Sequence, residues 1–341
     1  HNSDAEKNIP FDKAIKMLKE LCEHKELTDV GQNFKYDMKV VKKYAINFKT
    51  SIEDTMLMSY VLNSGGKHDL GTLASNFLDH EAISYEDVVG KGKDQITFAD
   101  VDMQKAVTYA CEDSDLTLLL YGKLKSKLLK DKRLYDVYRS IEIKLMLIIA
   151  EMEYLGVSID NKELDKQSND LKKRIDKIEN QIYSISGREF NISSPKQIQE
   201  IFYDELKLPV LKKTPKGQPS TNEDVMTQLA ENHELPSLIL SFRNLLKLKN
   251  TYTDKLGAQV SSVSKRLHTS YNQTITITGR LSSSSPNLQN IPIRTTDGKK
   301  IRSAFIPRQG FKLFSADYSQ IELRIMAHLS NDLEMIKSFV D

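Results

Sequence analysis

The stretch LFSADYSQIELR, from Leu313 to Arg324, carries the most information about the fold of this chain. An apolar, strand-like run delivers one acid, Asp317, where the apolar spacing changes to that of a helix. Glu322 and Arg324 follow within the apolar start of that helix, so we expect both charges at partly buried positions. An acid at a strand end is a common metal ligand. The alternative interpretation is a helix-capping acid followed by two solvated charges.

Four segments of the chain resemble one known family. The string SADYSQIELRIMAHLS, residues 315–330, resembles motif A of the family A DNA polymerases, the DNA polymerase I group. VGQNFKYD (30–37) and YACEDSD (109–115) resemble the second and third motifs of its proofreading exonuclease domain, and TGRLSSSSPNLQNIPIR (278–294) resembles its strand and loop leading into the palm. The segments occur in family order, so the resemblance spans nearly the whole chain.

The resemblance implies a mixed α/β, multidomain fold. We expect a partial RNase H-like 3′-5′ exonuclease domain over residues 1–133, a mainly helical thumb over 134–265, and the beginning of the polymerase palm, with motif A, over 266–341. Up to Leu129 short apolar segments alternate with helices, the last beginning near Val101, as in an α/β domain. The β character of the chain after Arg266 also agrees with a palm.

Within the expected thumb, apolar residues predict a long helix with a packed seam. They recur at spacings of four and three: Leu171, Ile175, Ile178, Ile182 and Ile185. Gly187 is expected to end this helix, and the stretch 242–256 is its expected antiparallel partner. Ser194 followed by Pro195 predicts the start of a further short helix, with Gln197 completing the capping signal.

Composition adds broad limits. With 341 residues, 39% of them hydrophobic, the chain can form about two domains. A net charge of +2 gives no global basic field, so any nucleic-acid surface must be a local patch. Cys22 and Cys111 offer no disulfide framework, and no apolar run approaches the roughly 18 residues of a membrane span. We expect a soluble, intracellular protein without membrane contact, in a bacterial cytoplasm or an organelle such as a plastid or apicoplast.

The resemblance implies a nucleotidyl-transfer site at motif A. Two Mg²⁺ ions would activate the primer 3′ hydroxyl and compensate the charge of the triphosphate. Asp317 would supply a carboxylate ligand and Tyr318 a backbone carbonyl. Glu322 resembles the steric gate that selects deoxyribonucleotides, and Gln320 and Ile321 would line the incoming nucleotide beside it. The family's motifs B and C, which complete this site, are absent from the sequence.

The same resemblance implies contacts with primer-template DNA. Arg294 resembles the arginine that reaches the minor groove at the primer terminus, where every base pair presents an acceptor. Gln289 and Asn290 belong to the same LQNIP string. The other expected contacts are basic residues that face phosphates: Arg280, Arg302, Lys247, Lys249 and Lys255. The expected partners are primer-template DNA and deoxynucleoside triphosphates, bound by a monomer.

The exonuclease resemblance points to three residues. Asp37 and Asp113 match metal-binding carboxylates, and Tyr109 matches the tyrosine that orients the attacking water. Tyr109 and Asp113 stand four residues apart, which places them on one face of a helix. The complete site holds two divalent ions between four carboxylates, and the DxE pair of the first motif is absent here. We therefore expect an incomplete cage and little editing activity from this fragment.

These observations favour a piece of a DNA polymerase large fragment, with template-directed synthesis and 3′-5′ editing as the parent activities. Both activities are expected to be incomplete in the fragment itself. Two other interpretations are a non-catalytic module that clamps duplex DNA and a stand-alone 3′-5′ exonuclease. Motif A argues against the exonuclease, because a nuclease has no use for a steric gate.

Overall fold

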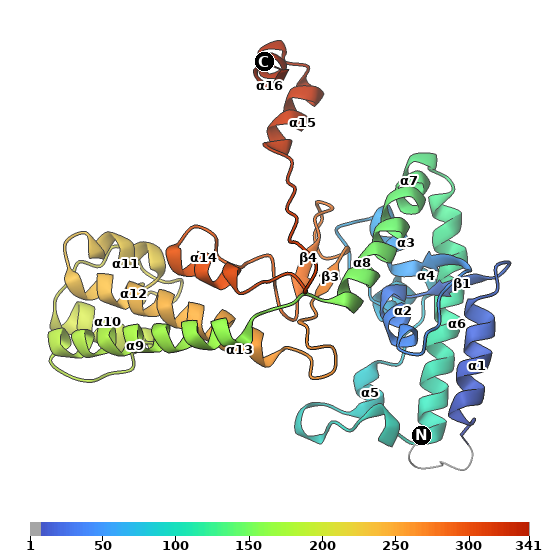
Figure 1. Cartoon of the computed structure of the whole chain (residues 1–341), viewed down its shortest axis with the longest axis horizontal. Helices are drawn as coiled ribbons and strands as arrows, with labels where there is room; N and C mark the ends of the chain where they lie inside the picture. Colours follow the sequence, from blue (N-terminus) through green and yellow to red (C-terminus); the bar gives the residue numbers. More distant parts are fainter. Residues whose placement is uncertain (1–7, 341) are drawn as a thin grey trace.

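The computed structural model describes residues 8–340, so the outermost residues of the first and last expected domains, 1–7 and 341, lie outside it. Helices dominate the structure, which confirms a mixed, helix-rich α/β fold. Three parts can be distinguished in Figure 1: an α/β body, a long helical arm, and a C-terminal pair of helices that stands away from both.

The α/β body is built on a short parallel sheet. Strand β1 (Thr28–Gly31) pairs with β2 (Ser51–Asp54), and α2 (Phe34–Lys42) connects them. The long helix α6 (Met103–Leu128) packs against β1, α3 (Thr55–Leu62) and α4 (Leu70–Leu78). The remaining elements of the body are short or peripheral: α1 (Phe11–Cys22), α5 (Tyr85–Val89), and the 3₁₀ turns η2 (Gly92–Asp94) and η3 (Phe98–Asp100).

A continuous apolar core holds this body together. Its fully buried members come from α3, α4, α6 and the connection that follows: Leu57, Met58, Leu73, Leu120, Leu124, Leu128, Tyr138 and Met146. That connection comprises α7 (Lys132–Val137), the π-helical turn η4 (Tyr138–Glu142) and α8 (Ile143–Leu155). The Tyr138 hydroxyl accepts from the Asp54 amide (2.9 Å) and donates to Glu53 (2.7 Å), which fixes the connection to β2.

The arm consists of two long antiparallel helices, as the apolar spacing predicts (Figure 1). Helix α9 (Asn161–Ser186) ends at Gly187, whose φ of 71° is left-handed, and α12 (Glu234–Leu248) returns beside it. The buried seam includes Leu171, Ile175 and Ile182, packed in one cluster with Phe242 and Leu245. The other arm elements are α10 (Pro195–Gln199), η5 (Glu200–Glu205), α11 (Glu223–Ala230), η6 (Lys249–Thr253) and α13 (Asp254–Ala258).

Two details of the arm refine the sequence analysis. Ser194 caps α10 as predicted, accepting from the Gln197 amide at 3.5 Å. The Gln197 side chain, however, accepts from the Asn191 amide (2.6 Å). At the base of the arm, a small cluster joins it to the next segment: Leu164, Tyr252, Leu256, Leu267, Ile301 and Ala304.

The region after the arm begins with an antiparallel pair, β3 (Ser270–Asn272) and β4 (Ser282–Ser284), followed by α14 (Thr296–Ser303). The strand predicted for residues 313–316 is not formed. Leu313 and Phe314 are 68% and 90% exposed, and within residues 8–340 this run belongs to no sheet. An apolar run forms a β-strand only when a neighbouring strand completes its backbone hydrogen bonds. Helices α15 (Ile321–Ser330) and α16 (Leu333–Val340) follow.

Two further observations concern expectations from composition. None of the helices within residues 8–340 is long and apolar enough to cross a membrane. Both cysteines are free, Cys22 in a buried position and Cys111 in an exposed one.

Candidate functional site

A polar pocket of about 630 Å³ on the α/β body brings together the three residues of the exonuclease resemblance. Asp37 enters from α2, and Tyr109 and Asp113 enter from α6. The lining also includes the end of β1 with Gly31, the start of α4 with Asp69, and the segment 82–85. Residues far apart in the sequence thus meet in one place, which the resemblance implies and the spacing of Tyr109 and Asp113 alone does not.

The start of α2 is held by a residue that sequence analysis did not single out. Asp54, at the end of β2, is 1% exposed and caps α3 by accepting from the Leu57 amide (3.0 Å). Its other oxygen accepts from the Phe34 amide (2.7 Å), the first residue of α2. An aspartate between a strand and an apolar helix is the local signal for such a cap. Asp54 therefore anchors the helix that carries Asp37.

Close approach at the strand end makes Gly31 necessary. A Cβ at this position would lie 2.3 Å from the Phe34 ring, which is itself buried. The chain then passes through Asn33, in the left-handed conformation with φ of 59°, before α2 begins. This sharp turn directs the following helix, and Asp37 with it, towards the pocket.

Burial in this pocket raises the pKa values of three of its acidic groups. Burial raises the pKa of Asp37, opposed by a backbone hydrogen bond. Burial also raises the pKa of Asp113, against the hydrogen bond from Tyr109. Burial, followed by the bond to Asp113, raises the pKa of Tyr109 to about 12. Tyr109 is therefore a hydrogen-bond donor at neutral pH and not a general base.

The pocket offers the start of a cation site. Carboxylate oxygens are the ligands that Mg²⁺ prefers, and Asp37 and Asp113 present two of them. Within the described part of the chain, no three His, Cys, Asp or Glu residues are grouped to hold a metal ion. Asp69 is engaged as the cap of α4, accepting from the Thr72 amide (2.9 Å) and hydroxyl (2.8 Å). The carboxylates of Asp37 and Asp113 and the phenol of Tyr109 are thus the groups that could act on a ligand in this pocket, whereas the Asp69 carboxylate caps α4.

Motif A is laid out along the surface. Asp317 and Tyr318 are exposed in an extended segment, the tyrosine by 80%, and Gln320 with φ of 52° precedes α15. The expectation that Glu322 and Arg324 are partly buried is wrong. Glu322 forms an exposed ion pair with Arg280 (3.1 Å).

The exposure of motif A has a simple physical cause. Arg324 donates to the Ser319 carbonyl (3.0 Å) and lies over the Phe339 ring, so its contacts are local. Ile321, which the resemblance places beside the nucleotide, is 37% exposed. Charges at the start of a helix become buried only when another element packs over them. Among the described elements, α16 is the one that packs closely against α15, and it leaves Glu322 and Arg324 exposed.

Part of the expected DNA surface is a groove of about 590 Å³ at the base of the arm. Lys247, Lys255 and Asn290 line it together, and the Tyr252 hydroxyl donates to the Asn290 carbonyl (2.5 Å), which holds the 286–290 loop against the arm. A groove with two lysines and an asparagine suits the backbone of a nucleic acid.

The other predicted DNA contacts divide into free and engaged side chains. Arg294 and Arg302 are exposed, the first before α14 and the second on it. Lys249 is paired with Asp254 (2.7 Å). The Gln289 side chain accepts from the Ser283 amide (3.1 Å) and donates to the Leu281 carbonyl (2.9 Å), so it closes its own loop.

Comparison with protein families divides the chain into two matched regions. Residues 3–129 match the family model described as 3′-5′ exonuclease, and residues 161–341 match that of DNA polymerase family A. The first region contains the pocket with Asp37, Tyr109 and Asp113, and the second contains the arm, the groove and motif A.

Relatives and a solved structure agree with this division. DNA polymerase I of Pseudomonas aeruginosa is 47% identical over 332 residues, which cover 96% of this chain and 36% of that protein. DNA polymerase I of Rhizobium leguminosarum is 45% identical over 99% of this chain and 33% of that protein. The chain thus spans about a third of the length of these relatives. The POL domain of Pol1 from M. smegmatis, in complex with DNA primer-template and dNTP, matches with a TM-score of 0.79 and 32% identity, over 98% of this chain and 55% of that one.

Proposed function

This chain belongs to DNA polymerase family A, and from this premise we propose that it is the part of a DNA polymerase I that carries an editing domain, the thumb and the opening of the palm. One observation supports the proposal most directly. Asp37, Tyr109 and Asp113 meet in one pocket of a chain whose C-terminal half matches a polymerase. The proposed domains are the editing domain over residues 1–133, the thumb over 134–265 and the opening of the palm over 266–341. The protein is proposed to be an intracellular monomer, in a bacterial cytoplasm or an organelle.

The proposed synthetic activity is transfer of a deoxynucleotide to a primer 3′ hydroxyl. Asp317 and the carbonyl of Tyr318 would bind Mg²⁺, which supplies charge compensation at the triphosphate. Glu322 would exclude a 2′ hydroxyl, beside Gln320 and Ile321 at the nucleotide. The exposure of this segment leaves Asp317 and Tyr318 accessible to a ligand. The solved relative binds DNA primer-template and dNTP, which supports the same substrate classes here.

The proposed editing activity is hydrolysis at a DNA 3′ end. Asp37 and Asp113 would contribute ligands to divalent ions, Mg²⁺ in our proposal. Each carboxyl must be ionised for this, and a bound cation would favour the ionised form although burial raises both pKa values. Tyr109, with a pKa of about 12, keeps its proton and can donate a hydrogen bond that orients the attacking water.

Duplex DNA would lie along the groove at the base of the arm. Lys247 and Lys255 would contact phosphates, and Arg294 would reach the minor groove near Asn290. Arg302 is proposed as a further phosphate contact. Arg280, Lys249 and Gln289 are proposed with less support, because their side chains serve contacts within the protein.

The test of synthesis is primer extension with Asp317→Ala in a chain that contains all polymerase motifs. We expect extension to be lost while duplex binding, measured by fluorescence anisotropy, is retained. Glu334→Ala is the matched control, since Glu334 is an exposed acid on the neighbouring helix α16. Unchanged extension in Asp317→Ala would remove Asp317 from the site. Duplex binding without extension by the unaltered chain would favour the non-catalytic module instead.

The test of editing is digestion of single-stranded DNA by a chain that includes a DxE pair. We expect Asp37→Ala and Asp113→Ala each to abolish digestion, because each removes a carboxylate from the pocket. Asp115→Ala is the control, as Asp115 is exposed on α6 close to Asp113. Digestion that persists in both pocket variants would exclude the pocket as the editing site.

A further inference from the structure

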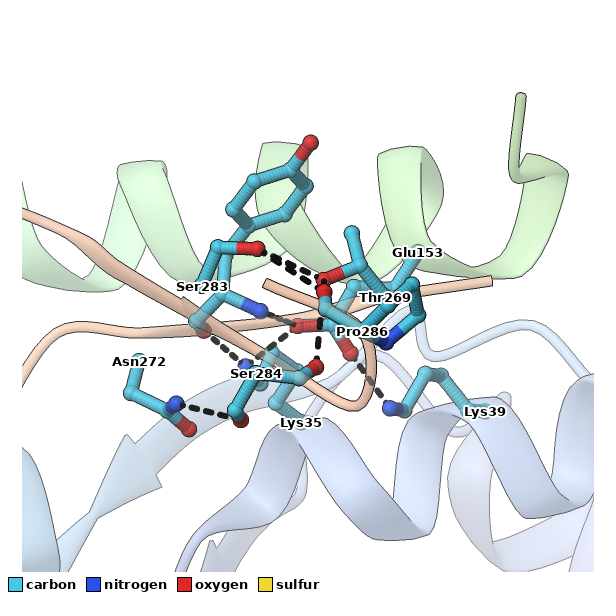
Figure 2. Close-up of polar contacts among 9 residues, drawn as sticks. Lys35, Lys39, Glu153, Thr269, Asn272, Ser283, Ser284 and Pro286 are labelled. Carbon is cyan, nitrogen blue, oxygen red and sulfur yellow. Dashed lines mark hydrogen bonds and ion pairs between the residues drawn. The ribbon is translucent and has the colours of Figure 1, made fainter. Parts of the chain in front are cut away.

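Glu153, on α8, is a buried acid that joins two other elements of the chain. Its side chain is 1% exposed, and its Oε1 accepts from Lys35 Nζ (2.6 Å) and from the Tyr271 amide (2.6 Å). Its Oε2 pairs with Lys39. In the view of Figure 2, Lys35 and Lys39 lie on α2 below the hairpin, and Glu153 extends from α8 above the hairpin. One carboxylate therefore contacts both α2 and β3.

The lysines lie on the opposite side of α2 from the editing pocket. Lys35 and Lys39 are one helical turn apart and so share a face. Asp37 stands between them in the sequence and lines the pocket, whereas neither lysine does. Any displacement of α2 at its contact with Glu153 would therefore also displace Asp37, because Lys35, Lys39 and Asp37 are on the same helix.

The Glu153 and Lys35 side chains form hydrogen bonds to the outer edge of β3, where a neighbouring strand would otherwise bond. Tyr271 is paired opposite Ser283 of β4, yet its amide donates to Glu153 and its carbonyl accepts from Lys35. In an antiparallel ladder, both backbone groups of one residue point to the same side. Tyr271 therefore presents the outer edge of β3, and the Glu153 and Lys35 side chains satisfy that edge as a neighbouring strand would.

Removing the carboxylate would disturb both elements together. A buried charge that loses its partner is strongly destabilising, while an intact buried pair contributes little net stability. Without Glu153, the ammonium groups of Lys35 and Lys39 would face each other uncompensated, and the Tyr271 amide would lose its acceptor. Because the intact pairs add little net stability, the main effect of Glu153, Lys35 and Lys39 is to fix the relative position of α2 and β3.

Neighbouring contacts extend the same junction. Gln273 donates to the Glu142 carbonyl (3.1 Å) and carboxylate (2.6 Å). Farther along, the Tyr60 hydroxyl donates to the Thr276 carbonyl (2.7 Å) and accepts from the Gly279 amide (3.1 Å). The segment from Tyr271 to Gly279 is thus attached to α8, η4 and α3 at four residues spread along it, Tyr271, Gln273, Thr276 and Gly279.

We propose that Glu153 is a positioning residue that fixes helix α2, and with it Asp37, onto the first strand of the palm. The editing pocket and the palm hairpin then move as one rigid unit. The attachment itself is independent of catalysis. Its consequence for cleavage rests on the proposed editing function.

The first test measures hydrogen exchange in the full chain. Glu153→Met removes both acceptor oxygens at similar side-chain length, and we expect exchange in residues 34–42 and 270–272 to rise about tenfold or more. Glu151→Met is the matched control: Glu151 is also on α8 and pairs with Lys42 of α2, but its side chain is 49% exposed. That variant should leave 270–272 unchanged. Unchanged exchange in both segments of Glu153→Met would overturn the proposal.

A conservative variant keeps the proposal testable if Glu153→Met does not fold. In Glu153→Gln, the amide oxygen can still accept from Lys35 and from the Tyr271 amide, but the amide nitrogen then faces Lys39. We expect slow exchange to be retained at 270–272 and lost around Lys39. Slow exchange at both places would contradict a role for the charge.

The second test measures cleavage of single-stranded DNA in a chain with complete editing motifs. Displacement of Asp37 should lower kcat in Glu153→Met about ten- to hundredfold with KM unchanged, because Asp37 lies in the proposed reaction centre while most of the pocket lining comes from elements other than α2. Faster exchange with an unaltered kcat would overturn the positioning of Asp37. If the unaltered chain does not cleave DNA, the editing function fails, while faster exchange in Glu153→Met would still support the attachment.

Discussion

The burial of Asp54 leads to a quantitative prediction for pH-dependent stability. Burial, opposed by the bonds from the Leu57 and Phe34 amides, raises the pKa of this carboxyl from 3.8 to about 6. The folded state therefore holds a proton on Asp54 more tightly than the unfolded chain does. The resulting stabilisation is complete below about pH 3.8 and is lost as the pH rises through about 6.

The size of the effect follows from the two values. At about 1.36 kcal/mol for each pH unit, the interval from 3.8 to about 6 corresponds to roughly 3 kcal/mol of unfolding free energy. The perturbation is Asp54→Asn, which cannot ionise. Its amide nitrogen would face the Phe34 amide, which costs about 1–3 kcal/mol at every pH. The informative quantity is thus the slope with pH and not the absolute stability.

The assay is urea unfolding of both proteins between about pH 4 and pH 7. The stability of the wild type relative to Asp54→Asn should fall by about 2–3 kcal/mol across this range. Asp69→Asn is the control, because Asp69 also caps a helix: burial acts to raise its pKa, but the Thr72 bonds outweigh burial and lower it. Its contribution is lost as the pH falls, which is the opposite sign. Parallel curves for the wild type and Asp54→Asn would refute the reasoning.

Two predictions concern the arm. Ile239 on α12 is fully buried in the arm core, so Ile239→Ala should lower the unfolding free energy by about 2–5 kcal/mol in urea unfolding. Ile185 on α9 is 40% exposed, so Ile185→Ala should lower it by less than about 1 kcal/mol. Equal losses of unfolding free energy would contradict the observed seam. Arg174 on α9 binds Asp297 on α14 through two bonds of 2.8 and 2.9 Å, but its side chain is 42% exposed, so a double-mutant cycle with Arg174→Met and Asp297→Asn should give a coupling of only about 0.5–1 kcal/mol that weakens with salt. A coupling that is insensitive to salt would argue against an ion pair.

The sequence predicts best where local pattern and tertiary structure have the same cause. The spacing of Leu171, Ile175 and Ile182 reflects the burial of one helix face, so it predicts both the helix and its partner. Gly187 acts through its left-handed backbone and Ser194 through the hydroxyl that accepts from the Gln197 amide, so both signals are local and equally visible in the sequence. That Tyr109 and Asp113 face the same side could be predicted because both lie four residues apart on α6, whereas their meeting with Asp37 of α2 is expected from the family resemblance.

Other features depend on contacts that no local pattern encodes. Glu153 appears as an ordinary acid in an apolar helix, and its partner Lys35 lies 118 positions away. Asp54 has a capping signal, but its second bond to the start of α2 depends on the pairing of β1 with β2. The run from Leu313 to Ala316 is apolar enough for a strand, but a strand also requires a neighbour to complete its hydrogen bonds.

The shape of the arm has a mechanical consequence. Helix α9 has 26 residues, so it is about 39 Å long at about 1.5 Å per residue. Its base is joined to the following segment by the cluster around Leu164 and Ile301, while the lysine-rich loop 212–224 lies near the far end (Figure 1). A tilt of roughly 5° at the base would carry the far end by about 3 Å. Small repacking within this cluster therefore suffices to shift the far end of the arm by several ångström.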